Sequence, residues 1–415
     1  MNDARFMLLA LRLARRGCGA TSPNPMVGAV LTKRGKIIGR GWHRRAGLPH
    51  AEIEALRDAR KRGHNPRGAT LYVTLEPCCT HGRTPPCTDT IISAGIKKIV
   101  IGAIDPNPKH AGKGFKILQR AGIEVATIGK TAPSPVLRTP SPPTGERVSE
   151  GRVRGRMVER KLADGCERLN EAFNHWIVRR TPFVTVKAAM TLDGKIATAN
   201  GESKWITGEK ARARGMKLRQ GSDAILVGIN TILADNSGLT FRPVQSPKSK
   251  VQSKKLRRII LDSQARTPLN AKVVSDEFAA LTTIVVSKSA PKKRTVALAR
   301  RVKVLVAPLA KNSSLDLRWL LKKLGGENVT SLLVEGGGEV NASFLIGGFA
   351  NRVAFFYAPK ILGGRDSRKA VAGEGVSRLG KAVQLREIEW RKLGGDLLLT
   401  ARVDQTRLDG VPSRD

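Results

Sequence analysis

Short apolar runs alternate with amphipathic stretches along residues 22–130. Two of these runs, on either side of Arg34 and Gly35, predict a β-hairpin. Further strands are expected at 71–75, 97–103 and 123–129, and helices at 50–63, 89–95 and 114–122. Residues 1–17 have helical spacing of apolar and charged positions and predict an amphipathic first helix. Strands and helices in this order form a parallel or mixed sheet sandwiched by helices.

The alternation stops at residues 131–161, where proline, serine, threonine and arginine replace most apolar residues. Such a composition cannot bury a core, so we expect a loop-like or disordered insertion there. A basic, polar stretch at 245–258 is interpreted as a second insertion of the same kind. Between the two, a helix is predicted at 163–180 and leads into the second half of the chain.

From Pro182 onward the strand–helix alternation resumes and predicts a second α/β domain of roughly 220 residues. Its strands are expected at 183–190, 223–233, 257–262, 282–287, 302–308, 331–337, 352–359 and 396–403, with helices between them as at 208–221 and 314–326. The pattern therefore divides the chain into a first domain at 1–130, an inserted linker at 131–162, a second domain at 163–405 and a tail at 406–415.

The charge of the chain is strongly positive, with 74 lysines and arginines against 34 aspartates and glutamates and a net charge of +40. This excess makes a nucleic-acid-binding protein a rival interpretation. The basic residues are spread along the chain, however, without a zinc-finger pair, an aromatic RNA-binding run or a zipper-backed basic region. A basic surface also suits an enzyme of phosphorylated substrates, so no specific nucleic-acid partner is expected.

The cysteines and the apolar runs predict the compartment. Three of the five cysteines cluster in a motif typical of a metal site, which does not resemble a disulfide framework. No apolar run approaches the roughly 20 residues that span a bilayer, so no membrane association is expected. These features predict a protein of the reducing cytoplasm.

One group of residues carries a recognisable chemistry. His50 and Glu52 open a predicted helix, and Cys78 and Cys87 follow a predicted strand. One histidine and two cysteines can hold Zn²⁺ and leave a coordination position for water, whose proton a nearby glutamate can transfer. This pattern is typical of a zinc hydrolytic deaminase, although eight residues separate the two cysteines where the general signature has two. Cys79, next to Cys78, can also compete as a ligand.

In the second half, mostly polar candidate residues gather at the ends of predicted strands, where open α/β sheets bind ligands. They are Ser203, Trp205, Thr207, Arg219, Asp235, Leu239, Arg242 and Glu335. Gly336, Gly337 and Gly338 stand between a strand and a helix predicted to begin near Glu339. Glycines at such a junction let backbone N–H groups approach a phosphate, but a tight turn explains the same run equally well.

Several blocks of the chain resemble the bifunctional deaminase/reductase family of riboflavin biosynthesis. They include TSPNPMVGAV, RAGLPHAEIEALRDA, ATLYVTLEPCCTHGRTPPCTDTIISAG, DPNPKHAGKGFKILQRAGIEV, LNEAFNHWI, MTLDGKIAT, GESKWITG, TILADNSGLTFR and LLVEGGGEVNASFL. The resemblance implies an α/β protein with an N-terminal cytidine-deaminase-like three-layer domain and a C-terminal dihydrofolate-reductase-like domain. It also implies the cofactors Zn²⁺ and NADPH, small phosphoribosylated pyrimidine substrates, and self-association into a homo-oligomer.

The resemblance further implies two consecutive reactions on one chain. The first domain would hydrolytically remove the 2-amino group of 2,5-diamino-6-(5-phosphoribosylamino)pyrimidin-4(3H)-one. The second domain would use NADPH to reduce the ribosyl chain of 5-amino-6-(5-phosphoribosylamino)uracil, which gives 5-amino-6-(5-phosphoribitylamino)uracil.

Roles for individual residues come from the same resemblance. His50, Cys78 and Cys87 would bind zinc, Glu52 would transfer protons, and the long interval between the cysteines would form a substrate loop. The implied substrate contacts of the deaminase are Asn24, His81, Arg83 and Thr84. The implied NADPH positions are Ala189, Trp205, Thr231, Asp235, Ser263, Gly337, Gly338, Glu339, Val340, Asn341, Ala342 and Ser343. The implied substrate positions of the reductase are Lys187, Ser203, Arg219, Leu239, Arg242 and Glu335.

Three departures from the family pattern matter for function. Glu54 stands where many relatives have a second histidine, and Cys79 where serine is usual. Asn236 and Ser237 replace an Asp-Pro pair in the cofactor loop, which leaves open an alternative in which the deaminase is active and the reductase half is degenerate. A nucleic-acid-binding or editing deaminase is the third alternative, and it rests on the net charge alone.

Overall fold

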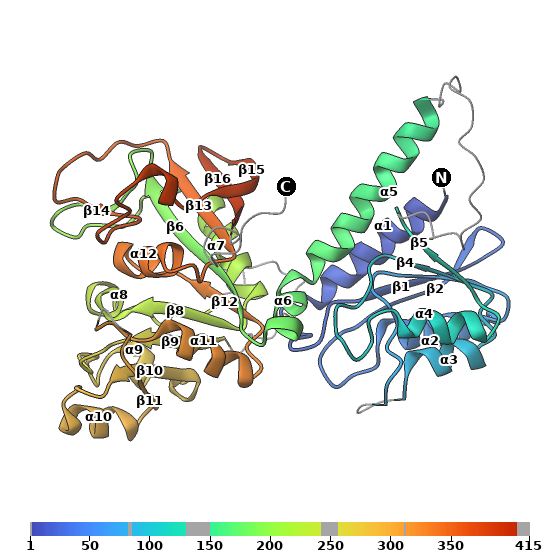
Figure 1. The fold of residues 1–415 in the computed structure, drawn as a ribbon, viewed down its shortest axis with the longest axis horizontal. Helices are drawn as coiled ribbons and strands as arrows, with labels where there is room; N and C mark the ends of the chain where they lie inside the picture. The colour runs from blue at the N-terminus through green and yellow to red at the C-terminus, as the bar shows by residue number, and fades with distance from the viewer. Residues whose placement is uncertain (1, 82–84, 130–149, 242–255, 311–312, 405–415) are drawn as a thin grey trace. The chain divides into compact units, whose positions relative to one another are not determined.

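The computed structural model describes residues 2–81, 85–129, 150–241, 256–310 and 313–404, except for the side chains of residues 2 and 150–156. The chain divides into two compact units, Met1–Arg179 and Arg180–Asp415, and each is a β-sheet covered by helices (Figure 1). Most of the first expected insertion, most of the second and the whole tail at 406–415 lie outside the described residues.

The first unit is built on a five-stranded mixed sheet with the order β2-β1-β3-β4-β5. Its strands are β1 Gly28–Lys33, β2 Lys36–Trp42, β3 Thr70–Val73, β4 Lys98–Ile101 and β5 Glu124–Thr127. β1 pairs antiparallel with β2 and β3, whereas β3, β4 and β5 run parallel. The predicted hairpin and mixed sheet are confirmed, and the hairpin turn places Arg34 and Gly35 at positive φ.

Helices cover both faces of this sheet and make three layers. They are α1 Asn2–Ala14, α2 Ala51–Lys61, α3 Cys87–Ser93, α4 Lys113–Arg120, α5 Glu150–Leu169 and α6 Glu171–Arg179, with a 3₁₀ turn η1 at Arg15–Gly17. Figure 1 shows α1 and α5 on one face and α2, α3 and α4 on the other. Fully buried apolar side chains such as Leu31, Ile99 and Ile101 fill the space between these layers.

Two glycines of β2 bring α2 unusually close to the sheet. A Cβ atom on Gly39 would lie 2.3 Å from the carbonyl oxygen of Ala55, and one on Gly41 would lie 2.3 Å from that of Ala51. Any larger residue would push the helix away from the strand. The close contact fixes the start of α2, and with it the position of His50 and Glu52.

The segment between the two sheets differs from its prediction. Residues 150–161 are helical, and α5 and α6 belong to the first unit, so the change of unit falls after Arg179 and not at the predicted boundary of 162. The physical reason is burial. Cys166 of α5 is completely buried in the core of the first unit. It packs so closely against Gly102, the residue after β4, that a Cβ atom on this glycine would lie only 2.4 Å from the sulfur of Cys166.

The second unit contains a nine-stranded sheet with the order β11-β10-β9-β8-β12-β6-β13-β16-β15 and a small two-stranded sheet, β14-β7. The strands are β6 Phe183–Thr191, β7 Lys195–Ala197, β8 Ala224–Gly228, β9 Arg257–Leu261, β10 Thr282–Ser287, β11 Lys303–Ala307, β12 Ser331–Val334, β13 Arg352–Ala358, β14 Arg368–Lys369, β15 Leu385–Leu393 and β16 Asp396–Val403. In this order, all strands from β11 to β13 are parallel to their neighbours. β16 pairs antiparallel with β13, and β15 pairs antiparallel with β16.

The helices of the second unit follow its parallel strands. They are α7 Glu209–Gly221, α8 Ile229–Asp235, α9 Lys272–Ser275, α10 Lys292–Ala299, α11 Leu317–Gly326 and α12 Gly338–Ile346, with 3₁₀ turns η2 Ala279–Leu281 and η3 Leu379–Lys381. Two apolar clusters lie against the sheet, one containing Leu332 and Phe344 and the other containing Ile260 and Val286. The alternating α/β architecture predicted for this half is confirmed.

Two details of the second unit were not expected. Strands β7, β14 and β15 were not predicted. Arg257 and Arg258, which fall in both the expected second insertion and the expected strand at 257–262, begin strand β9, so the insertion ends before them. Arg258 is among the largest fully buried side chains, with 1% of its surface exposed.

Candidate functional site

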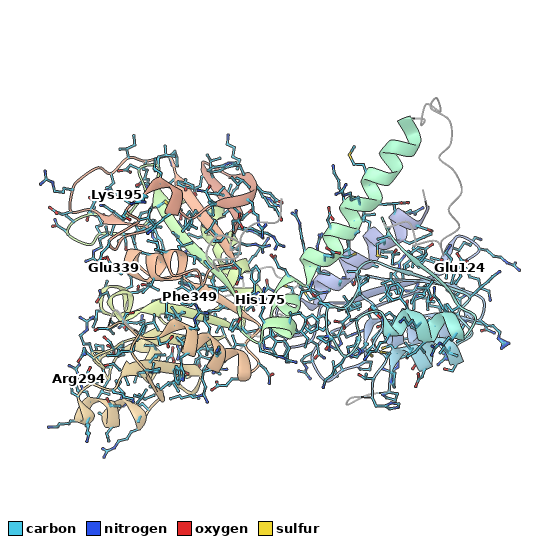
Figure 2. The ribbon with its side chains drawn as sticks, in the orientation of Figure 1. Glu124, His175, Lys195, Arg294, Glu339 and Phe349 are labelled. Carbon is cyan, nitrogen blue, oxygen red and sulfur yellow. The ribbon has the colours of Figure 1, made fainter. Side chains whose placement is uncertain are left out.

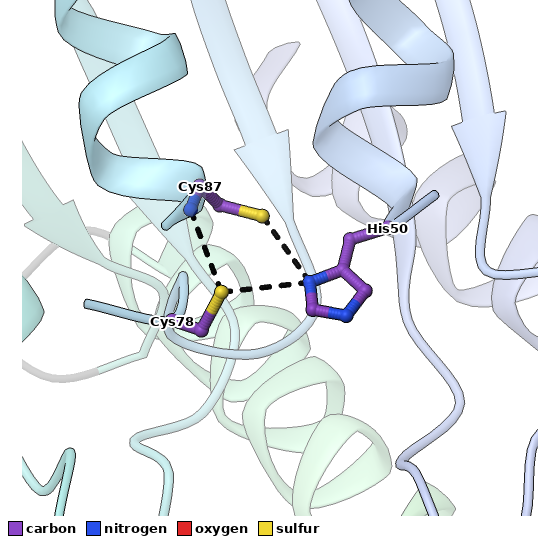
Figure 3. A group of neighbouring side chains, drawn as sticks. All are labelled: His50, Cys78 and Cys87. Atoms are coloured by element: carbon purple, nitrogen blue, oxygen red, sulfur yellow. Dashed lines mark hydrogen bonds between the residues drawn. The ribbon is translucent and has the colours of Figure 1, made fainter. Parts of the chain in front are cut away.

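Three elements of the first unit bring a histidine and two cysteines together. His50 immediately precedes α2, Cys78 follows β3, and Cys87 is the first residue of α3. The Nδ1 atom of His50 lies 3.3 Å from Sγ of Cys87 and 3.5 Å from Sγ of Cys78 (Figure 3). One donor atom from each residue lies within 4.8 Å of the other two, so all three can contact one ion.

The electrostatics of the cluster suit a metal. The backbone N–H of Cys87 donates to Sγ of Cys78 at 3.4 Å. The pKa of Cys78 is lowered to about 4, first by a hydrogen bond with the side chain of Cys87 and then by His50, which favours the thiolate that binds metals. One imidazole nitrogen and two sulfurs form the ligand set that Zn²⁺ takes in catalytic sites, with one position left for water.

Glu52 is the second residue of α2, two residues after His50, and its carboxylate is buried. Only 3% of the residue is exposed, and its Oε2 atom has no hydrogen-bond partner among the described residues. Burial raises the pKa of Glu52. Buried carboxylate oxygens in proteins nearly always accept a hydrogen bond. The free Oε2 atom can accept one from a water molecule or from the substrate beside the metal ligands. The orphaned oxygen therefore supports a metal with a water beside it.

A pocket of about 300 Å³ opens onto these residues. It is lined by Pro23, Asn24, Pro25, Val27, His43, His50, Glu52, Leu75, Glu76, Cys78, Asp105, Asn107, His110, Phe173, Trp176 and Ile177. Of the predicted substrate contacts, Asn24 lies in this pocket, with its amide nitrogen 3.3 Å from Nε2 of His43. His81 is exposed and is not among the lining residues, while Arg83 and Thr84 lie outside the described residues.

Sequence reasoning missed several residues that line this pocket. Asp105 and Asn107 follow β4, so the strand-end pattern used for the second half could have found them. His43 is 2% exposed, and burial lowers its pKa. Phe173 and Trp176 come from α6, far along the chain, and no local signal pointed to them.

Glu76 lines the pocket and holds one of its loops in place. Its carboxylate accepts hydrogen bonds from the backbone N–H groups of Asp105, Gly112 and Gly114 at 3.2, 3.0 and 3.0 Å. These contacts fix the loop that carries Asp105 and His110. Sγ of Cys79 lies 3.5 Å from Nδ1 of His110, so Cys79 faces this loop and is not part of the three-residue cluster.

In the second unit, a charged triad lies where three elements meet. Glu335 follows β12, Arg219 lies on α7 and Lys187 lies on β6. Nε and Nη2 of Arg219 donate to the two carboxylate oxygens of Glu335 at 2.9 Å each, and Nζ of Lys187 lies 3.6 Å from one of them. Burial alone would raise the pKa of Glu335, but Lys187 and then Arg219 lower it to about 2. Three predicted substrate residues are therefore brought together.

Two arginines hold the loop that carries Leu239. Nη1 of Arg219 donates to the carbonyl of Thr240 at 2.9 Å, and Nη1 of Arg258 donates to that of Gly238 at 2.8 Å. Arg258 also forms a bidentate pair with the carboxylate of Asp276, at 2.6 and 2.7 Å. Leu239 itself has φ 49°, a left-handed conformation that non-glycine residues seldom adopt without support. Arg242 lies outside the described residues.

The predicted cofactor positions form a second group in this unit. The glycine run leads into α12, with Gly337 preceding the helix, and Glu339 lies in its first turn (Figure 2). A pocket of about 640 Å³ lies against this helix start and is lined by Ile196, Asn230, Leu233, Ala234, Gly338, Glu339, Arg368, Lys369 and Ala372. Backbone N–H groups at a helix start and nearby arginine and lysine side chains suit a phosphate-bearing ligand.

The remaining predicted cofactor positions lie on several elements of this unit, of which α8 and α12 contribute lining residues to this pocket. Thr231 and Asp235 are on α8, Ala189 is on β6, Ser263 follows β9, and Val340, Asn341, Ala342 and Ser343 are on α12. Ser203 and Trp205 lie on the segment after β7, and Lys204 between them pairs with Asp235 at 3.4 Å. Asn341 is fully buried and donates to the carbonyl of Ala370 at 2.8 Å.

The substituted pair after α8 is accommodated. Asn236 has φ 42° and ends α8 in the left-handed conformation, which asparagine tolerates better than most residues. Its side-chain oxygen accepts a hydrogen bond from the backbone N–H of Lys272 at 2.9 Å, at the start of α9. Asn236 therefore connects the cofactor loop to the next helix, and Asp235 before it is retained.

Among the described helices, none is long and apolar enough to cross a membrane.

Comparison with known families gives a match for each unit. A model described as the cytidine and deoxycytidylate deaminase zinc-binding region matches residues 1–103. A model described as the RibD C-terminal domain matches residues 182–399. Residues 104–181, which include α5 and α6, lie in neither match.

Full-length relatives match both units at once. The riboflavin biosynthesis protein RibD of Actinobacillus pleuropneumoniae is 41% identical over 399 residues, with 96% of this chain and 95% of the relative covered. The RibD of Escherichia coli is 36% identical over 405 residues, with 96% and 99% covered.

Solved structures agree in fold across the same span. Acinetobacter baumannii RibD has a TM-score of 0.78 and 31% identity, with 97% of this chain and 99% of that chain covered. A Thermotoga maritima diaminohydroxyphosphoribosylaminopyrimidine deaminase/5-amino-6-(5-phosphoribosylamino)uracil reductase has a TM-score of 0.76 and 34% identity over the same shares.

Proposed function

The chain belongs to the RibD family of riboflavin biosynthesis, and from this premise we propose how its residues share two reactions. The protein is a bifunctional enzyme, a deaminase and a reductase that act on pyrimidine intermediates of the riboflavin pathway. The first reaction is hydrolytic deamination of 2,5-diamino-6-(5-phosphoribosylamino)pyrimidin-4(3H)-one. The second is NADPH-dependent reduction of 5-amino-6-(5-phosphoribosylamino)uracil to 5-amino-6-(5-phosphoribitylamino)uracil. The observation that carries this assignment is the convergence of His50, Cys78 and Cys87 beside a buried carboxylate.

In the deaminase, His50, Cys78 and Cys87 would hold the zinc ion. A zinc ion held there would lower the pKa of a water molecule toward neutrality and so supply a nucleophile at physiological pH. Glu52 would accept a proton from this water and return it to the departing amine, because its Oε2 atom is buried and has no hydrogen-bond partner among the described residues. Asn24 contacts the pyrimidine, and His81, Arg83 and Thr84 contact the ribose phosphate, for which the arginine fork is suited.

In the reductase, NADPH supplies the hydride, and the protein orients the two ligands. The cofactor contacts are Ala189, Trp205, Thr231, Asp235, Ser263, Gly337, Gly338, Glu339, Val340, Asn341, Ala342 and Ser343. The substrate contacts are Lys187, Ser203, Arg219, Leu239, Arg242 and Glu335. Glu335 is ionised at neutral pH, since its pKa is about 2, and its charge holds both cationic partners in place.

An assay that reads the two reactions separately tests the assignment. With the diamino substrate, the zinc-loaded protein should release ammonia, and it should oxidise NADPH only when the deaminated product is present. If NADPH absorbance at 340 nm stays constant with the deaminated substrate supplied directly, the reductase half is degenerate. If ammonia release is absent as well, both assigned reactions are wrong.

We also propose that the protein forms a homo-oligomer through the edge of its large sheet. The edge strand β15 and its neighbour expose Ile388 (54%), Trp390 (57%) and Leu397 (39%), an unusual concentration of apolar surface for an unpaired edge. Light scattering should give the mass of at least two chains for the wild type and a mass nearer one chain for Trp390→Ser. The control is Val296→Ser on α10, which is similarly exposed at 54% and should not change the mass.

A further inference from the structure

Helix α6 lines the deaminase pocket although it lies outside both matched family segments. Phe173, Trp176 and Ile177 belong to the pocket that also contains His50 and Glu52. The zinc-binding family match ends at residue 103, and the reductase match begins at residue 182. The wall of the pocket that α6 forms is therefore supplied by a segment that neither match describes.

The spacing along α6 separates a pocket face from an outer face. Phe173, Trp176 and Ile177 are three and four residues apart and thus share one side of the helix. Trp176 and Ile177 are 7% and 9% exposed, whereas Val178 is 53% exposed. The ring centroids of Phe173 and Trp176 lie 6.4 Å apart, so the two aromatic rings form one continuous apolar surface.

Asn170 attaches the start of α6 to the loop that carries Asn24. Its side-chain oxygen accepts a hydrogen bond from the backbone N–H of Met26 at 2.7 Å, and its amide nitrogen donates to the carbonyl of Met26 at 2.9 Å. Asn170 is 3% exposed, and its own carbonyl accepts from the N–H of Asn174 at 2.8 Å. The helix and the Asn24 loop are therefore fixed to each other as one side of the pocket.

The same pocket also has polar lining residues. Glu52, Asp105, Asn107 and His110 supply hydrogen-bonding groups, and the metal ligands lie beside them. A planar heteroaromatic ring has polar edges and apolar faces, and a pocket with one polar and one aromatic side can satisfy both. The aromatic side in this pocket comes from Phe173 and Trp176.

We propose that Phe173 and Trp176 of α6 are substrate-binding residues of the deaminase, and that their rings contact the face of the pyrimidine. This inference rests on the proposed function, because it assumes a pyrimidine substrate in this pocket. The two side chains bind and orient the ring, and Glu52 transfers the protons. Residues 1–103 alone thus lack a wall of the deaminase site.

The test compares Phe173→Leu with Val178→Ala, a control on the outer face of the same helix. Each full-length variant is assayed for ammonia release, zinc content and reductase activity on the deaminated substrate. Phe173→Leu should raise the KM of deamination about tenfold and leave kcat, zinc content and reductase activity near wild type. Trp176→Phe keeps an aromatic ring and should raise the KM less than Phe173→Leu does, while Val178→Ala should leave it unchanged.

Two results would overturn the inference. The first is a KM of Phe173→Leu equal to that of Val178→Ala. The second is a parallel loss of zinc and kcat with an unchanged KM, which would mean that α6 only supports the fold. A wild-type protein that releases no ammonia would remove the proposed function itself, a failure that is visible before any variant is compared.

Discussion

Replacing Glu52 with glutamine should lower the rate of ammonia release by about 1000-fold, in the middle of the range for loss of a proton-transferring residue. Glutamine preserves the size of the side chain but cannot accept a proton. The zinc content should stay at one ion per chain, because His50, Cys78 and Cys87 are unchanged. Reductase activity on the deaminated substrate should also be unchanged, which shows in the same preparation that the protein is folded.

Glu54→Gln provides the matched control on the same helix. Glu54 lies two residues further along α2 and pairs with Arg44 and Arg57 at 3.2 Å each. Both arginines are largely exposed, so the loss of these ion pairs should change ammonia release by less than about twofold. Equal activity of the Glu52 and Glu54 variants would contradict the role assigned to Glu52.

Replacing Glu335 with glutamine should abolish most reductase activity and destabilise the second unit. The side chains of Lys187, Arg219 and Glu335 are 21%, 13% and 11% exposed, so removing the carboxylate leaves two poorly solvated cations without their counter-charge. Breaking a buried ion pair on one side costs about 3 kcal/mol of unfolding free energy. We also expect a fall of about 100-fold in kcat/KM of the reductase, since the substrate-facing cations are displaced.

Glu327→Gln separates this effect from the loss of any paired glutamate. Glu327 also pairs with two cations, Arg257 and Lys303, but its side chain is 26% exposed, so its loss should cost less than about 1 kcal/mol. The measurements are chemical denaturation and NADPH oxidation, with ammonia release as the internal standard. Equal loss of unfolding free energy in the two variants would contradict the larger cost expected for the buried Glu335.

The pKa of Glu335 also predicts a direction with pH. The folded-state pKa is about 2, below the ordinary value of 4.5, so the stabilisation is complete above about pH 4.5. It is lost progressively as the pH falls toward 2. In Glu335→Gln this part of the acid sensitivity should be absent.

The strands that could be predicted from the sequence are those whose apolar residues repeat regularly and are buried. The eight strands expected in the second half correspond to β6, β8–β13 and β16, most of which are buried on at least one face. β15 has no buried face along most of its length, and its ladder is irregular between Arg386 and Glu389, so no pattern distinguished it from a loop. β7 and β14 are only three and two residues long.

The first part of α5, residues 150–162, was missed for a different reason. The prolines of the predicted insertion all precede residue 144, whereas 150–169 contains none, and composition averaged over the whole stretch concealed this change. The helical signal lies in buried residues such as Leu162, Ala163 and Cys166, which pack against the first unit. The boundaries drawn from composition therefore assigned 150–162 to the linker and 163–179 to the second domain, whereas both stretches belong to the first unit.

The local motif identified the metal-ligating residues, because the ligands sit in short segments that a motif can describe. The pocket wall from α6 could not be found in this way. In the sequence, Phe173 and Trp176 look like any apolar pair on a helix. Their place in the pocket depends on the hydrogen bonds between Asn170 and Met26, which are 144 residues apart. Arg258 was interpreted both as the end of a basic, polar insertion and as the start of a strand. Only its five hydrogen bonds, to Thr282, Gly238, Val273 and both carboxylate oxygens of Asp276, show that it is interior.

The two arginines that hold the Leu239 loop have a consequence for tolerance to sequence change. Arg219 fixes the carbonyl of Thr240 and Arg258 that of Gly238, both before the stretch 242–255 begins. Phe241 and Leu256, at its two ends, are buried at 9% and 3% exposure. Because both carbonyls are held before residue 242, the position of Leu239 should depend little on the length of the stretch that follows.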